Sequence, residues 1–146
     1  MNKGSINFYN QSTHFILPRK TLIRQWLHQI ARKEAYQIYQ LNYIFCNDAY
    51  LLEMNNGYLK HDTLTDIITF NLSDKSKSIE GEIYISLERV AENARIFSQS
   101  KSMELKRVMA HGLLHLMGYK DKSKMDILTM RKKEDTCLSL WLKISK

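Results

Sequence analysis

The chain has 146 residues, of which 44% are hydrophobic and 25% are charged, and this balance is typical of one globular domain spanning residues 1–146. No stretch approaches the roughly 18 consecutive apolar residues of a membrane span, and the N-terminus lacks a signal-peptide pattern. We therefore expect a cytoplasmic protein with no membrane contact. Lysine and arginine outnumber acidic residues by 22 to 15, which favours a polyanionic partner because basic side chains displace the counterions of phosphates.

The predicted elements alternate between strands and helices. The first half contains a strand at 5–9, a helix after Pro18, a strand at 41–46 and a short helix. Asn47 or Asp48 can cap this short helix, which runs to Met54 and stops at Asn56-Gly57. The second half contains strands at 66–72 and 82–86, a helix from Leu87, a helix after 102 that ends at Gly118, and a last helix after Ser123. The strand at 66–72 has apolar residues on both faces near its start, as a central strand would, and the polar stretch 73–80 makes it one arm of a long-looped hairpin.

The two cysteines predict buried, reduced thiols. Cys46 and Cys137 lie far apart in apolar surroundings, and they form no Cys-x-x-Cys pair. A disulfide framework is not expected.

The residues that carry chemistry are concentrated in 111–121. His111 and His115 lie four residues apart on a predicted helix, so both rings can reach one ion. Gly118 can end this helix in a turn with positive φ, after which Asp121 can return toward the same point. Two imidazoles and one carboxylate leave a coordination position open, as in catalytic zinc sites, although the same set also holds ferrous iron in oxygenases. We predict a metal site and favour zinc.

The spacing of the histidines also resembles the metzincin peptidases, whose pattern is His-Glu-x-x-His-x-x-Gly-x-x-His. In those enzymes the glutamate beside the first histidine is the general base for the attacking water. That position is Gly112 here. A metalloprotease is therefore the least favoured interpretation.

The segment 111–121 resembles the signature of the YbeY family of bacterial endoribonucleases, His-Gly-x-Leu-His-Leu-x-Gly-Tyr-Asp-His. The matching positions are His111, Gly112, Leu114, His115, Leu116, Gly118 and Tyr119. Lys120 replaces the aspartate of the signature, and Asp121 replaces its third histidine ligand. An aspartate oxygen can bind zinc, but its negative charge makes the metal a weaker Lewis acid than three neutral imidazoles would.

The resemblance extends over about residues 41–121. The family segment Asn-x-x-Tyr-Arg-x-Lys-Asp-x-Pro-Thr-Asp-Val-Leu-Ser-Phe is matched at Asn55, Tyr58, Asp62, Thr65, Asp66 and Phe70, and 81–86 resembles the family strand Gly-Asp-Ile-x-Ile-Ser. The arginine that the family places after the tyrosine, thought to contact substrate phosphate, is Leu59 here. The neighbouring Lys60 is a candidate substrate-binding residue, although an ammonium supplies a point charge and not a bidentate fork.

The resemblance implies an α+β fold with a mixed, mostly parallel four-stranded sheet, helices around it and a metal site on a helix in a cleft. It implies a zinc-dependent, single-strand-specific endoribonuclease with one zinc per chain, which hydrolyses phosphodiester bonds with a metal-activated water. The implied roles are ribosomal RNA maturation and ribosome quality control. The implied partners are precursor ribosomal RNA and the small ribosomal subunit, with a ribosomal protein or an assembly GTPase as helper.

The general base is not identified by these patterns. Glu82, Glu104 and Asp66 are candidates by residue type, and each is also explained as a solvated or salt-bridged carboxylate. Arg107 lies one helical turn before His111, where it could bind phosphate or, as we favour, pair with Glu104. The missing family arginine also motivates a second hypothesis, a ribosome-assembly factor that binds RNA or protein and whose metal is mainly structural.

Overall fold

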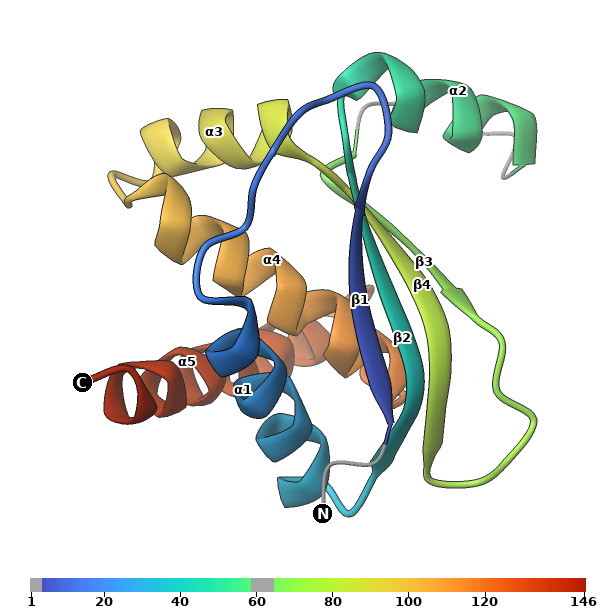
Figure 1. Ribbon diagram of the computed structural model, residues 1–146, viewed down its shortest axis with the longest axis vertical. Coiled ribbons are helices and arrows are strands. Elements are labelled where there is room, and N and C mark those ends of the chain that lie inside the picture. Colours follow the sequence, from blue (N-terminus) through green and yellow to red (C-terminus); the bar gives the residue numbers. More distant parts are fainter. Residues whose placement is uncertain (1–3, 59–64) are drawn as a thin grey trace.

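The computed structural model describes residues 4–58 and 65–146, and these form a four-stranded sheet with five helices (Figure 1). The strands are β1 (Ser5–Asn10), β2 (Gln37–Cys46), β3 (Ile67–Asn71) and β4 (Ser78–Ser86). The helices are α1 (Lys20–Lys33), α2 (Asp48–Tyr58), α3 (Leu87–Ile96), α4 (Lys101–Leu116) and α5 (Lys124–Ile144). The order of elements is the one predicted from the sequence. Three predicted bounds were wrong, because β2 and β4 begin earlier and α2 continues past Asn56-Gly57.

The sheet is mixed and mostly parallel, as predicted. Its strand order is β1-β2-β4-β3. Strand β2 pairs in parallel with β1 and with β4, whereas β3 pairs antiparallel with β4. The predicted hairpin is therefore present as the β3–β4 pair.

Strand β3 lies at the edge of the described sheet, so the prediction of a central strand was wrong. Its apolar residues are covered by helices on both faces and not by a second neighbouring strand. Ile67 lies against Gly112 of α4 on one face. Ile68 belongs to a small core with Leu51 and Met54 of α2 on the other. An edge strand between two helices has the same apolar pattern as a central strand.

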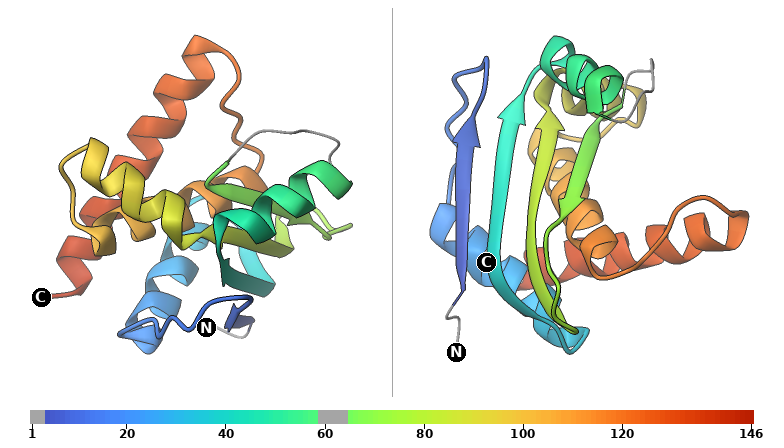
Figure 2. Two further views of the ribbon diagram at one scale, coloured as in Figure 1. Left: turned by 90° about the horizontal axis from the view of Figure 1, so that it is seen from above. Right: turned by 90° about the vertical axis from the view of Figure 1, so that its right-hand side faces the viewer.

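The main hydrophobic core lies on one side of the sheet. Helices α1 and α4 contact the strands there, and α5 packs on α1 and α4. Figure 2 shows α2 at one end of the sheet and α5 extending from the helical side. Trp26 of α1 is fully buried, and its indole Nε1–H donates to the Cys137 carbonyl of α5 at 2.8 Å. This bond fixes α5, whose residues contribute to the site described below.

Helix α4 approaches β3 and β4 closely because glycines lie at the contact. A Cβ atom on Gly112 would come within 2.8 Å of Ile67 Cδ1 and 2.9 Å of Ile83 Cγ2. A Cβ atom on Gly81 of β4 would come within 2.9 Å of Leu116 Cδ1. Since real Cβ contacts are essentially never this short, a larger residue at either position would require its neighbours to shift. The contact positions α4, which carries both histidines.

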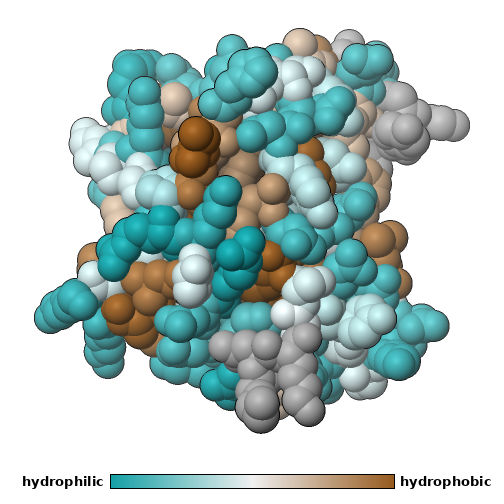
Figure 3. Space-filling view, in the orientation of Figure 1, coloured by the Kyte–Doolittle hydropathy of each residue, from teal (hydrophilic) through white to brown (hydrophobic). Residues whose placement is uncertain are grey.

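The surface of the protein is mixed. Figure 3 shows that hydrophilic residues predominate on the face seen in Figure 1, with apolar surface in separate areas. Cys46 and Cys137 are buried and free, as predicted. Within the described residues, no helix is both long and apolar enough to cross a membrane.

Candidate metal centre

Helix α4 has defined ends that fix where its histidines lie. The Ser100 hydroxyl caps its N-terminus by accepting a hydrogen bond from the Met103 amide. At the other end Gly118 has φ 98° and the Tyr119 amide donates to the Leu114 carbonyl at 3.1 Å. This left-handed turn sends the chain back along the helix, as predicted.

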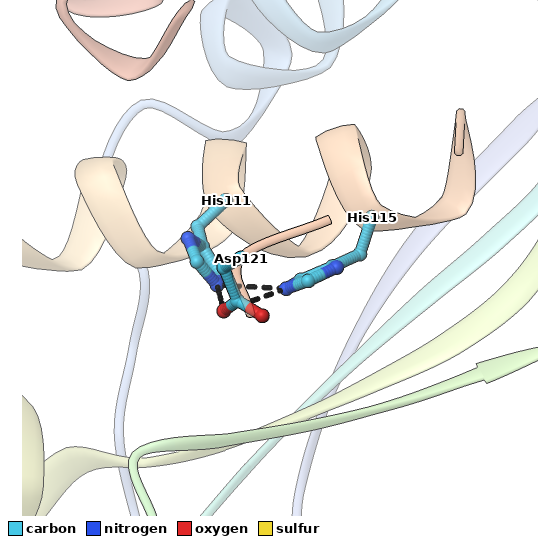
Figure 4. Close-up of side chains that lie close together, drawn as sticks. All are labelled: His111, His115 and Asp121. Atoms are coloured by element: carbon cyan, nitrogen blue, oxygen red, sulfur yellow. Dashed lines mark hydrogen bonds and ion pairs between the residues drawn. The ribbon is translucent and has the colours of Figure 1, made fainter. Parts of the chain in front are cut away.

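The structure brings together the three side chains for which the sequence predicts a metal. The Nε2 atoms of His111 and His115 are 3.0 Å apart. The Oδ2 atom of Asp121 lies 3.3 Å from the first nitrogen and 3.2 Å from the second. Figure 4 shows the two rings and the carboxylate pointing toward one another. One ion could contact all three atoms.

Each histidine is held through its other ring nitrogen. His111 Nδ1 lies 2.6 Å from Glu134 Oε2 on α5, and His115 Nδ1 lies 3.0 Å from the Tyr119 carbonyl oxygen. An Nδ1 proton on each ring would donate to these acceptors and leave the Nε2 lone pair available. Metal-binding histidines in proteins are typically oriented by such carboxylates and carbonyls. The donor set and its orientation therefore fit a divalent metal of the zinc type.

The electrostatics couple His111 to its acidic neighbours. Burial by itself lowers the pKa of His111, but the hydrogen bond to Glu134 and the charges of Glu134, Asp66 and Asp121 outweigh burial, so the pKa is raised. Burial by itself raises the pKa of Glu134, but the hydrogen bonds from His111 and Arg107 outweigh it, so that pKa is lowered. In the metal-free protein these two groups therefore favour a charged pair.

A cavity of about 390 Å³ adjoins the cluster, and His111 and Asp121 form part of its wall. Among the three carboxylates proposed as a general base, Asp66 and Glu104 line this cavity. Glu82 does not line it, and its Oε1 accepts a hydrogen bond from the Tyr84 hydroxyl. Side chains alternate along β4, so Glu82 lies on the face opposite Ile83, which contacts α4.

Arg107 lines the same cavity, but its predicted pairing with Glu104 was wrong. The guanidinium donates to Glu134 at 2.9 Å and to Asp135 at 2.7 Å. These acceptors lie on α5, which packs against α4 and brings two carboxylates within reach. Lys60, the other candidate for substrate binding, lies outside the described residues, as does Leu59.

Two groups at the site were not identified from the sequence. They are the Glu134 carboxylate and the Tyr119 carbonyl oxygen, which hold His111 and His115. Helical spacing does place Glu134 on the apolar face of α5, with Met130, Cys137 and Trp141. The structure confirms that this face is buried, since Glu134 is only 5% exposed. A carboxylate on an apolar helix face indicates a buried partner.

The mixed sheet and the clustered His, His and Asp side chains together define an α+β protein with a candidate metal centre. The family model described as Endoribonuclease YbeY matches residues 7–141 of the chain. The chain therefore belongs to the YbeY endoribonuclease family, as the sequence motifs indicated.

Relatives support this assignment over nearly the whole chain. A protein of Cytophaga hutchinsonii described as Endoribonuclease YbeY is 51% identical over 140 residues, which cover 96% of this chain and 98% of that protein. A protein of Amoebophilus asiaticus with the same description is 46% identical and covers 92% and 91%. A solution structure from Thermotoga maritima matches with a TM-score of 0.63 and 27% identity, covering 95% and 93%. The predicted fold class is thus confirmed.

Proposed function

We propose that this chain is a metal-dependent, single-strand-specific endoribonuclease that acts in ribosomal RNA maturation and ribosome quality control. The observation that carries the proposal is the convergence of His111 Nε2, His115 Nε2 and Asp121 Oδ2 within 3.3 Å of one another. Membership of the YbeY family supports the reaction class, since its curated members are described as endoribonucleases.

The residues of the chain hold and shape the site. His111, His115 and Asp121 would hold one zinc ion, and Glu134 and the Tyr119 carbonyl would keep both rings in the binding tautomer. A bound zinc ion would supply Lewis acidity toward a phosphate oxygen and lower the pKa of water. Asp66 and Glu104 remain candidates for the proton acceptor, because both line the adjoining cavity.

The packing of Gly112 opposes a metalloprotease. The peptidase pattern needs a glutamate beside the first histidine, with its side chain near the metal. In this structure a side chain at position 112 would enter the contact with Ile67 and Ile83. A glutamate there would require Ile67, Ile83 or α4 itself to shift.

The partners and location that we propose follow from the family and the charge of the chain. The formal net charge of +7 supports binding to single-stranded or precursor ribosomal RNA. We extend the proposal to the small ribosomal subunit, with a ribosomal protein and an assembly GTPase as helpers, in the cytoplasm.

The test combines metal content with RNA cleavage. The purified protein should contain about one zinc per chain, as in other sites of this donor type, and should cut a ribosomal RNA precursor fragment internally. His115→Ala should lose both the metal and the cleavage. Tight RNA binding without cutting in both proteins would instead indicate an assembly factor with a mainly structural metal, and cleavage of unstructured protein would indicate a peptidase.

A further inference from the structure

The cavity beside the metal cluster has the size of a ligand pocket and a specific lining. Its volume of about 390 Å³ falls within the range of small-molecule sites, about 300–1,000 Å³. Its wall includes the carboxylates of Asp66 and Glu104, the amides of Asn93 and Gln99, and the ring of Phe97. Because His111 and Asp121 belong both to this wall and to the metal cluster, a group in the cavity lies beside the site where cleavage is proposed.

Glu104 is a buried acceptor without a donor. The residue is only 6% exposed, yet among the described residues its carboxylate has neither a hydrogen bond nor an ion pair. No fully buried side-chain oxygen of the described chain lacks a partner, so the oxygens of Glu104 retain access to the cavity. Glu134 is equally buried but accepts from His111 and Arg107. Glu104, unlike Glu134, can therefore accept hydrogen bonds from a group bound in the cavity.

Asp66 is a second carboxylate of the cavity wall with weak hydrogen bonding. Its carboxylate accepts from its own backbone N–H and from Asn93 Nδ2, and the second bond, at 3.5 Å, is near the limit of a hydrogen bond. Burial raises the pKa of both Asp66 and Glu104, and it outweighs the opposing charges, which are those of His111 for Asp66 and of Arg107 and Arg131 for Glu104. Carboxylates whose loss of water is not balanced by strong donors are expected to shift in this direction.

The charges of the lining disfavour a phosphate and favour a neutral donor. Asp66, Glu104, Asp121 and Glu134 all border the cavity, and its two arginines are already engaged, Arg107 by carboxylates of α5 and Arg131 by Glu134 at 3.5 Å. A phosphate inside would meet like charges at short range. A flat neutral group that carries N–H donors would instead satisfy the open acceptors.

An aromatic ring at the cavity completes the features of a base-binding site. Phe97 follows the last turn of α3, is 58% exposed and lines the cavity, so its ring is accessible to a group bound there. Proteins that bind single-stranded RNA commonly stack bases on such rings and read the base edges with polar side chains.

We propose that this cavity binds the nucleobase next to the scissile phosphate and prefers guanine, through donation from its N1–H and N2–H groups to Glu104. This inference rests on the endoribonuclease function proposed above. Guanine presents two adjacent donors on its Watson–Crick edge, which match the two oxygens of one carboxylate. Adenine and cytosine present one donor beside an acceptor, and uracil places its single donor between two acceptors.

Nucleoside binding tests the assignment without requiring cleavage. The four nucleosides, which carry no phosphate, are titrated into the full-length protein as purified and followed by NMR. Guanosine should bind about tenfold more tightly than uridine, the effect of one bidentate base contact. Glu104→Gln should reduce this preference to within about twofold, because an amide offers only one acceptor. Glu53→Gln, on the exposed side of α2, is the matched control and should retain the preference.

A second variant, Phe97→Ala, tests the same site if Glu104→Gln does not fold. Phe97→Ala removes an exposed ring and should weaken binding of all four nucleosides by about tenfold while keeping their order. Cleavage of single-stranded oligonucleotides with one guanosine should map next to that guanosine in the wild type.

The outcomes separate this inference from the proposed function. Equal binding of all nucleosides, or an unchanged guanosine preference in Glu104→Gln, would overturn the base site. Cleavage without base preference would also overturn it and would leave the nuclease in place. Guanosine-selective binding by a protein that cuts no RNA would support the base site and remove the proposed nuclease function.

Discussion

His111 Nδ1 lies 2.6 Å from Glu134 Oε2, so a candidate metal ligand on α4 is held by a carboxylate from α5. The same carboxylate accepts from Arg107, which ties the two helices together beside the site. The geometry of the cluster therefore depends on the packing of α5 against α4.

Glu134→Gln should weaken zinc binding by about 10–100-fold, the usual effect of removing a group that orients a metal-binding histidine. The affinity is measured by competition with a chelating dye at about pH 8, well above the ordinary histidine pKa, to limit proton competition. Asp135→Asn is the matched control, because Asp135 also pairs with Arg107 but has no contact with His111 in the described structure. Equal affinities of wild type and Glu134→Gln would show that the carboxylate does not support the site.

The stability of the metal-free protein should depend on pH through the same pair. The folded pKa of His111 is raised above 6.5, so its contribution is complete below pH 6.5 and is lost as pH rises through the folded value. The folded pKa of Glu134 is lowered below 4.5, so its contribution is present above pH 4.5 and is lost as pH falls through the folded value.

Together these shifts predict that the pair stabilises the metal-free protein most between pH 4.5 and 6.5. Urea unfolding in the presence of a chelator, repeated across this range, measures the effect. Glu134→Gln should flatten the pH dependence over the same range. Parallel curves for the two proteins would show that the pair contributes nothing to stability.

Asp121→Ala should sharply lower the metal content, because it removes one of three converging donor atoms. Asp121→His should keep the metal and replace a charged ligand with a neutral one. The metal would then be a stronger Lewis acid, and the acidic limb of the cleavage profile should move to lower pH. Unchanged metal content in Asp121→Ala, measured by atomic emission, would remove Asp121 from the site.

Gly112→Ala should destabilise the protein by about 1–3 kcal/mol, the usual cost of overpacking a core. The added Cβ would meet Ile67 and Ile83 at 2.8 Å and 2.9 Å. The sign of the change in the free energy of unfolding tests the contact, because alanine in place of glycine inside an ordinary helix stabilises a protein by about 0.5–1 kcal/mol. Urea unfolding of the metal-free protein gives the value, and a stabilised variant would contradict the close contact between α4 and the sheet.

Neither thiol should react in the folded protein. Burial raises the pKa of Cys46 and of Cys137 to about 12, so almost no thiolate is present at neutral pH. Titration with a chromogenic disulfide reagent should give no rapid reaction until a denaturant is added, when both thiols should react. Rapid modification of one thiol in the native protein would show that its site opens to solvent.

The sequence by itself determined the local features of this protein. Helical periodicity places His111 and His115 on one face of α4, and Gly118 allows the turn that returns Asp121 to them. The order of strands and helices followed in the same way from apolar periods and capping residues. These features depend on neighbours within a few residues, and such interactions can be read directly from a sequence.

Only the tertiary structure decided which distant side chains meet. Glu134 reaches His111 because α5 packs on α4, and Arg107 therefore pairs with α5 and not with Glu104. The sequence pattern did not show that β3 is an edge strand, because helices cover both of its faces and give it the apolar pattern of a central strand. Glu82 and Glu104 are indistinguishable as residue types, yet only Glu104 lines the cavity. Such contacts depend on how helices and strands pack, and this packing cannot be read from residue spacing along the chain.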